Sequence, residues 1–111
     1  MGSSDAIRVP GAEIDFVLGA ADDPETVDDF DVVVTLDDGT RWSAGLLTMG
    51  AIQRIMDRWA TTGEAEGGDF FQSDDLMILR RPGVPFATDL LRRLAAAGQI
   101  QYTLRQLHDD D

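Results

Sequence analysis

Hydrophobic and polar residues alternate along the first half of the chain in the period-two pattern of strands that bury one face. The alternation covers residues 14–18 and, more regularly, residues 30–36, where Phe30, Val32 and Val34 fall on one side. The β-branched residues of the second segment suit the pleated surface of a sheet. Both segments are therefore predicted to be strands, separated by a solvated loop.

A turn and a third strand follow directly. Residues 37–40 have the sequence DDGT, and Asp and Gly accept the positive φ angles that a tight hairpin turn demands. Trp42, Ala44 and Leu46 then fall on every second position. The second and third strands are thus expected to form a hairpin, which makes the sheet at least partly antiparallel.

Helical spacing begins at residue 48. Apolar side chains from Met49 to Trp59 recur at steps of three and four, with polar and charged residues on the other side. Thr48 can cap the free N–H groups at the start of this helix, and Gly63 stands where helices commonly end in a left-handed residue. The pattern predicts an amphipathic helix packed on the sheet, and we expect both Trp42 and Trp59 to be core residues.

The remaining patterns predict a mobile loop at 64–69, a central strand at 76–79, a second helix beginning near Pro85, and a last strand at 99–104. The order β-β-β-α-β-α-β, with one apolar stripe per helix, indicates an α+β fold of two layers. We expect a mostly antiparallel sheet of about five strands with the two helices on one face. The other face would stay partly open to solvent.

A single domain fits a chain of this length. We expect residues 1–10 to be a flexible leader, residues 11–107 to form one α+β domain, and residues 108–111 to be an acidic tail.

The charge of the chain narrows the choice of partners. The sequence holds 21 acidic and 9 basic side chains, for a net charge of −12, and every basic one is Arg. Such a surface repels exposed phosphates, so a nucleic-acid partner is not expected. The acidity has two readings: a solvated surface that reflects the amino-acid usage of the organism, or an acidic face for a basic protein.

Residue types that are missing also carry information. The chain has no cysteine, which excludes disulfides and thiolate chemistry and favours a reducing, cytoplasmic setting. No apolar run approaches the roughly 18–20 residues that span a bilayer, so no membrane partner is expected.

The usual constellations of an enzyme are not recognisable. His108, the one histidine, lies in the expected tail, and no lysine is present to act as a nucleophile or phosphate ligand. Asp74 and Asp75 interrupt an apolar stretch and are the best candidates for acid–base work, although an edge bulge or a cap explains them as well. Asp29 and Asp31 do not fit a calcium loop. We predict no catalytic residue, no cofactor and no metal.

Three short motifs resemble those of a family of small, acidic, uncharacterised bacterial proteins. They are D-G-x-x-W-x-A at 38–44, T-G-E at 62–64 and F-F-x-x-x-D at 70–75, within a similarity that covers about residues 30–104. The family pattern has a Trp where this chain has Gln72. The resemblance implies a fold but no reaction, and the size and acidity are similar to those of immunity proteins that neutralise bacterial toxins.

The sequence therefore predicts an acidic protein-binding module, of which an immunity-type inhibitor is one form, that docks on a basic surface. Carboxylates would steer the encounter and an exposed aromatic residue would act as a hot spot. The alternatives are a homo-oligomeric assembly component that uses the uncovered sheet face, and a small hydrolytic or ligand-binding enzyme. The candidate partner-binding residues are Asp22, Asp23, Glu25, Asp28, Asp29, Asp69, Phe70, Phe71, Asp74 and Asp75.

Overall fold

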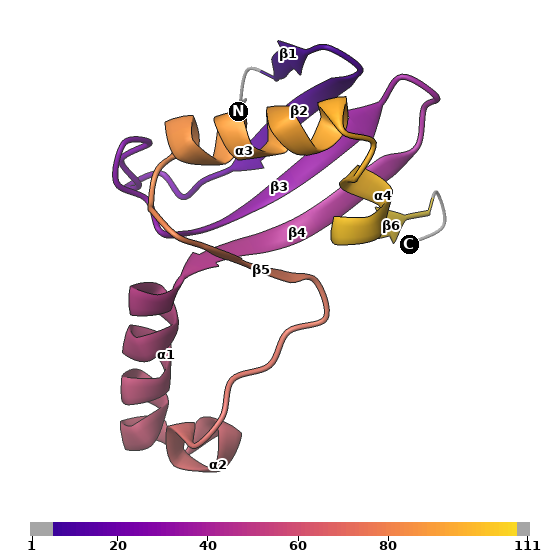
Figure 1. Ribbon diagram of the computed structural model, residues 1–111. Helices are drawn as coiled ribbons and strands as arrows, with labels where there is room; N and C mark the ends of the chain where they lie inside the picture. The colour runs from indigo at the N-terminus through magenta and orange to yellow at the C-terminus, as the bar shows by residue number, and fades with distance from the viewer. Residues whose placement is uncertain (1–5, 109–111) are drawn as a thin grey trace.

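A computed structural model of the protein describes residues 6–108. Its sheet is built from β1 (Ile7–Val9), β2 (Ala12–Val17), β3 (Asp29–Leu36), β4 (Arg41–Thr48), β5 (Leu76–Leu79) and β6 (Arg105–Leu107). The helices are α1 (Met49–Thr62), α2 (Glu64–Gly68), α3 (Val84–Ala96) and α4 (Ile100–Thr103) (Figure 1).

The sheet is mostly antiparallel, as the sequence predicts. Strands β1 to β4 follow one another in space as they do in the chain, each antiparallel to the next. The turn at 37–40 joins β3 to β4, with Gly39 at a φ of 87°. Beyond β4 the edge is shared, because β5 pairs in parallel with its second half and β6 antiparallel with its first half.

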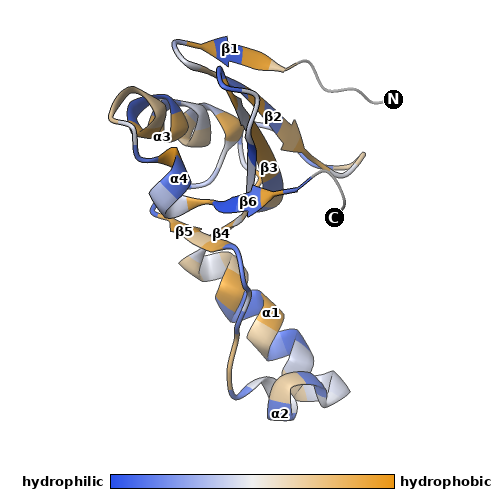
Figure 2. Ribbon diagram, turned by 90° about the vertical axis from the view of Figure 1, so that its right-hand side faces the viewer, coloured by the Kyte–Doolittle hydropathy of each residue, from blue (hydrophilic) through white to orange (hydrophobic). Residues whose placement is uncertain are grey.

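The hydrophobic core lies between one face of the sheet and helix α3. Phe30, Val32 and Val34, at alternate positions of β3, are buried on this face together with Ala87 and Leu91 of α3. Pro85 stands in the first turn of α3, where a missing N–H does no harm. In Figure 2, α3 and α4 lie on one side of the sheet. Among residues 6–108, no helix covers the other face, which we call the open face.

Two segments differ from the sequence prediction at the ends of the domain. Residues 7–9 lie in the expected leader but form β1, which pairs with β2.

At the other end of the domain, the expected strand at 99–104 is wrong: α4 occupies these residues, and the strand β6 follows. The burial explains the difference, since Ile100 and Leu104 are 1% and 7% exposed while Tyr102 between them is 78% exposed. A strand would put all three on one face, whereas a helical turn buries positions four apart. Residues 109–111 of the expected tail lie outside the described residues.

Helix α1 begins and ends as predicted, but it does not cover the sheet. The Thr48 Oγ1 accepts a hydrogen bond from the Ala51 N–H (3.1 Å), and Gly63, with a φ of 88°, donates its N–H to the Trp59 carbonyl. Because Thr48 is both the last residue of β4 and the cap of α1, no loop turns the helix back over the sheet. The helix instead projects beyond the end of β4 (Figures 1 and 2). The prediction of two helices on one face is therefore wrong for α1.

Candidate functional site

Residues 49–75 form a projection that we call the arm: α1, α2 and the return segment 69–75 that leads back to β5. Only Ala51 of α1 is buried. The apolar stripe of the helix, which the sequence places toward the core, is only partly buried: Ile52, Ile55, Met56 and Trp59 are half-buried, and Met49 is exposed. Trp59, expected in the core, lies in the arm, where its indole ring stacks on Phe71 with 5.6 Å between centroids and an interplanar angle of 16°.

The tip of the arm is a left-handed turn. In α2 the backbone is not that of a right-handed helix, because Ala65, Glu66 and Gly67 have φ angles of 50°, 55° and 73°. L-Residues adopt this conformation at a cost of roughly 1–2 kcal/mol each. The turn is closed by a hydrogen bond from the Asp69 N–H to the Ala65 carbonyl (3.1 Å). Residues 64–68, which the sequence places in a loop, thus form a left-handed turn with a strained backbone.

Gly68 fixes this turn against α1. A Cβ atom at position 68 would lie 2.1 Å from the carbonyl oxygen of Met56 and 3.1 Å from the Ala60 nitrogen. Only glycine permits such a close approach of the two backbones. The neighbouring Gly67 also has a positive φ, but a Cβ there would meet nothing within 4 Å.

Phe70 is held between two anchored neighbours. On one side the Asp69 N–H is bonded to the α2 turn, and on the other the Phe71 ring is stacked on Trp59. Phe70 itself is 49% exposed. Neither phenylalanine lies on a strand, because β5 begins only at Leu76. The two rings therefore do not point to opposite faces of the sheet: Phe70 is exposed and Phe71 is half-buried in the arm.

A cluster of carboxylates occupies the open face where the arm returns to the sheet. Asp31 of β3 lies opposite Gly45 of β4, and the Asp75 carbonyl accepts the Gly45 N–H (2.8 Å). A Cβ on Gly45 would lie 3.5 Å from Asp31 Oδ1 and 3.9 Å from Asp75 Oδ1, so the two carboxylates flank the space above this glycine. Partial burial raises the pKa of Asp31, and the negative charges of Asp75 and then Asp29 raise that pKa further.

Several acidic side chains of the loop between β2 and β3 form hydrogen bonds or an ion pair within the protein. The Asp22 Oδ2 accepts from the Gly19 N–H (2.7 Å), and the Asp23 Oδ1 accepts from the Glu25 N–H (2.9 Å). Asp28 binds Arg54 of α1 through both carboxylate oxygens, each at 2.8 Å. This ion pair ties the loop to the base of the arm.

The structure brings the predicted residues together in part. Asp69, Phe70, Phe71, Asp74 and Asp75 share the return segment, and the charges of Asp29 and Asp75 both act on Asp31. The loop residues Asp22 and Asp23 are engaged in their own turns. Two residues of this region, Asp31 and Trp59, were not among the candidates named from the sequence. Asp31 could have been found from its position opposite to Phe30 and Val32 in the alternation, whereas nothing local marks Trp59 as an arm residue.

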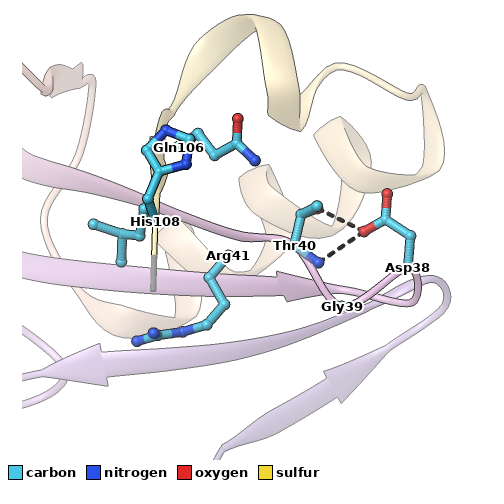
Figure 3. A pocket seen from close by; sticks show the side chains of 7 residues that line it. Asp38, Gly39, Thr40, Arg41, Gln106 and His108 are labelled. Carbon is cyan, nitrogen blue, oxygen red and sulfur yellow. Dashed lines mark hydrogen bonds between the residues drawn. The ribbon is translucent and has the colours of Figure 1, made fainter. Parts of the chain in front are cut away.

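A cavity of about 290 Å³ lies elsewhere, between the β3–β4 turn and β6 (Figure 3). Its polar lining includes Asp38, Thr40, Arg41 and His108. Asp38 accepts hydrogen bonds from the hydroxyl and the N–H of Thr40 (2.6 and 2.9 Å), which lower its pKa. Thr40 also accepts from the Trp42 indole N–H (2.9 Å). These groups stabilise the hairpin turn, so neither the Asp38 carboxylate nor the Thr40 hydroxyl is set up as a base or nucleophile.

Asp74 and Asp75, the candidates for acid–base chemistry, do not line this cavity. Within residues 6–108, no group of three or more His, Asp or Glu side chains is arranged to hold a metal ion. Over the same part of the chain, every helix is too short or too polar to span a bilayer. Comparisons with protein-family models, with curated proteins and with solved structures gave no match to this chain.

Proposed function

We propose that this protein is an acidic protein-binding module that docks on a basic partner through its arm and the neighbouring open face. The observation that carries the proposal is the arm itself. An amphipathic helix normally buries its apolar stripe in the core, but α1 has one buried residue and stands away from the sheet. A projecting element with half-covered apolar side chains is typical of a surface that another protein completes.

The charges around the arm favour a basic partner. Residues 49–75 contain six carboxylates and two arginines, a net of 2 − 6 = −4. One of these arginines, Arg54, is already bound by Asp28. At the base of the arm, Asp31 is destabilised in its charged form by burial and by Asp75 and Asp29. A cationic side chain placed there would relieve this repulsion, and the same charges would speed the encounter.

A second copy of the chain is a poorer occupant. In a symmetric dimer the same patch of each copy is used twice, so two net-negative surfaces would be brought together. Nucleic acids are disfavoured for the same electrostatic reason. The module would act as an immunity-type inhibitor if the basic surface that it covers is the working surface of a toxin. Such a role fits a cytoplasmic, cysteine-free protein.

Cross-linking followed by purification of the captured partner would test the function. With the purified pair, the association rate is compared for the wild type, for a variant with Asp29→Asn, Asp31→Asn and Asp75→Asn, and for a control with Asp109→Asn, Asp110→Asn and Asp111→Asn. Both variants lose three charges, so the proposal requires the first to associate more slowly than the second. Equal rates, or a chain that sediments only as a self-associated species with no partner, would count against it.

A further inference from the structure

We propose that Phe70 is an arginine-binding anchor: its exposed ring, which follows the α2 turn in an acidic segment of the chain, receives a guanidinium group of the partner. This inference rests on the proposed function and specifies which side chain of a basic partner the arm recognises.

The rigidity of Phe70 is the first argument. Its ring is 49% exposed, yet the backbone on one side is fixed by the Asp69–Ala65 hydrogen bond and on the other by the Phe71–Trp59 stack. An exposed aromatic side chain on a fixed backbone loses little conformational freedom on binding. Aromatic residues, Phe included, are enriched in protein interfaces relative to the rest of the surface.

The strain in the α2 turn is the second argument. Two non-glycine residues, Ala65 and Glu66, adopt left-handed φ angles, and Gly68 is pressed against the Met56 carbonyl. Backbone strain of this kind persists where the surrounding structure enforces it, and it is concentrated at functional sites. Here its effect is to reverse the chain so that Asp69 and Phe70 follow the tightest part of the tip.

The chemistry of the surroundings is the third argument. From residue 64 to residue 75 the chain carries five carboxylates and no basic side chain: Glu64, Glu66, Asp69, Asp74 and Asp75. An aromatic ring attracts a cation to its face, and the planar, weakly hydrated guanidinium group stacks there more readily than an ammonium group does. Asp69 precedes Phe70 in the chain, and a carboxylate near the ring would add charge-assisted hydrogen bonds that match the fork of an arginine.

The test uses two short, capped peptides that differ only in carrying two arginines or two lysines between glycine and serine residues. Binding to the intact protein is followed by amide chemical shifts in about 50 mM salt, where surface charges are only partly screened. The arginine peptide should shift the amides of residues 69–71 and bind more tightly than the lysine peptide. Phe70→Leu, which keeps an apolar side chain but removes the ring, should weaken the arginine peptide about two- to five-fold, the size of an exposed cation–π contact.

Tyr102→Leu is the matched control, because Tyr102 is an even more exposed aromatic residue on α4, outside the arm. It should leave the binding of both peptides unchanged. Equal affinity for the two peptides, unchanged by Phe70→Leu but weakened by Asp69→Asn, would overturn the arginine assignment and leave acidic docking intact. Shifts confined to residues outside 64–75 would also overturn it, whereas the proposed function is decided by the association rates with the protein partner.

Discussion

The Phe71 ring lies on the Trp59 indole, nearly parallel to it, and joins the return segment to α1 at the far end of the arm. The stack covers part of the apolar side of α1, which does not pack on the sheet. The core cluster contains no residue of the arm, so the stack and the close approach of Gly68 to Met56 are two of the contacts that hold the arm together.

Loss of the stack should loosen the arm without unfolding the domain. Phe71→Ala removes a ring pair worth about 0.5–1.5 kcal/mol, so amide hydrogen exchange in residues 69–75 should speed up while the exchange of β2 and β3 stays unchanged. Phe70→Ala, which removes an exposed ring next to it, should leave both regions as they are. Equal acceleration in the sheet would mean that the arm and core unfold as one unit.

The glycines of the tip offer a second test with a built-in control. Gly67 and Gly68 both have positive φ angles, but only at position 68 would a Cβ collide with α1. Gly67→Ala should therefore raise the free energy of the folded arm by roughly 1–2 kcal/mol, the cost of a left-handed L-residue. Gly68→Ala should raise it by clearly more. The near-ultraviolet circular dichroism of Trp59, recorded in a Trp42→Phe background, measures the change. Equal effects of the two substitutions would contradict the close approach.

Asp31 should make the stability depend on pH in a direction opposite to most carboxylates. Its pKa in the folded chain is raised above the ordinary value of 3.8, first by burial and then by Asp75 and Asp29. The folded state thus binds this proton more tightly than the unfolded chain, and the resulting stability is complete below 3.8 and lost as the pH rises through the folded pKa. Asp31→Asn should stabilise the protein at neutral pH, by less than about 1 kcal/mol because solvent screens the charge, and the gain should vanish in acid.

Asp89 supplies the control of opposite sign. Hydrogen bonds from Arg92 and Arg93 lower its pKa, so its contribution is present above pH 3.8 and is lost as the pH falls through the lower, folded value. Asp89→Asn should therefore destabilise the protein at neutral pH and match the wild type in strong acid. Urea unfolding of both variants across the acidic range would compare them, and a stabilising Asp89→Asn would contradict the geometry of α3.

The sequence predicted most of the sheet and both long helices, because those elements follow from local rules. The alternation in β3, the turn at 37–40, and the caps at Thr48 and Gly63 each depend on neighbouring residues alone. The position of α1 does not, since an amphipathic stripe says that a face is covered but not by what. Here the return segment covers it in part, which moves Trp59 from the core to the arm.

The prediction of a last strand at 99–104 was wrong for a different reason. Ile100, Tyr102 and Leu104 satisfy a period of two, but only Ile100 and Leu104 of these three are buried. So short a segment does not tell a strand from a helical turn by its pattern alone. An aromatic pair among carboxylates marks Asp69, Phe70 and Asp75 in the sequence, and all three lie on the return segment of the arm. Their grouping with Asp31 could not be predicted, because it depends on the parallel pairing of β5 with β4.

The salt dependence of docking tests the central claim most directly. With the captured partner, the association rate should fall steeply as the ionic strength rises, while the dissociation rate changes little, because distant charges steer the encounter and short-range contacts of the arm determine the lifetime. The variant lacking the charges of Asp29, Asp31 and Asp75 should show a shallower slope. An association rate that is the same at low and high salt would contradict the account.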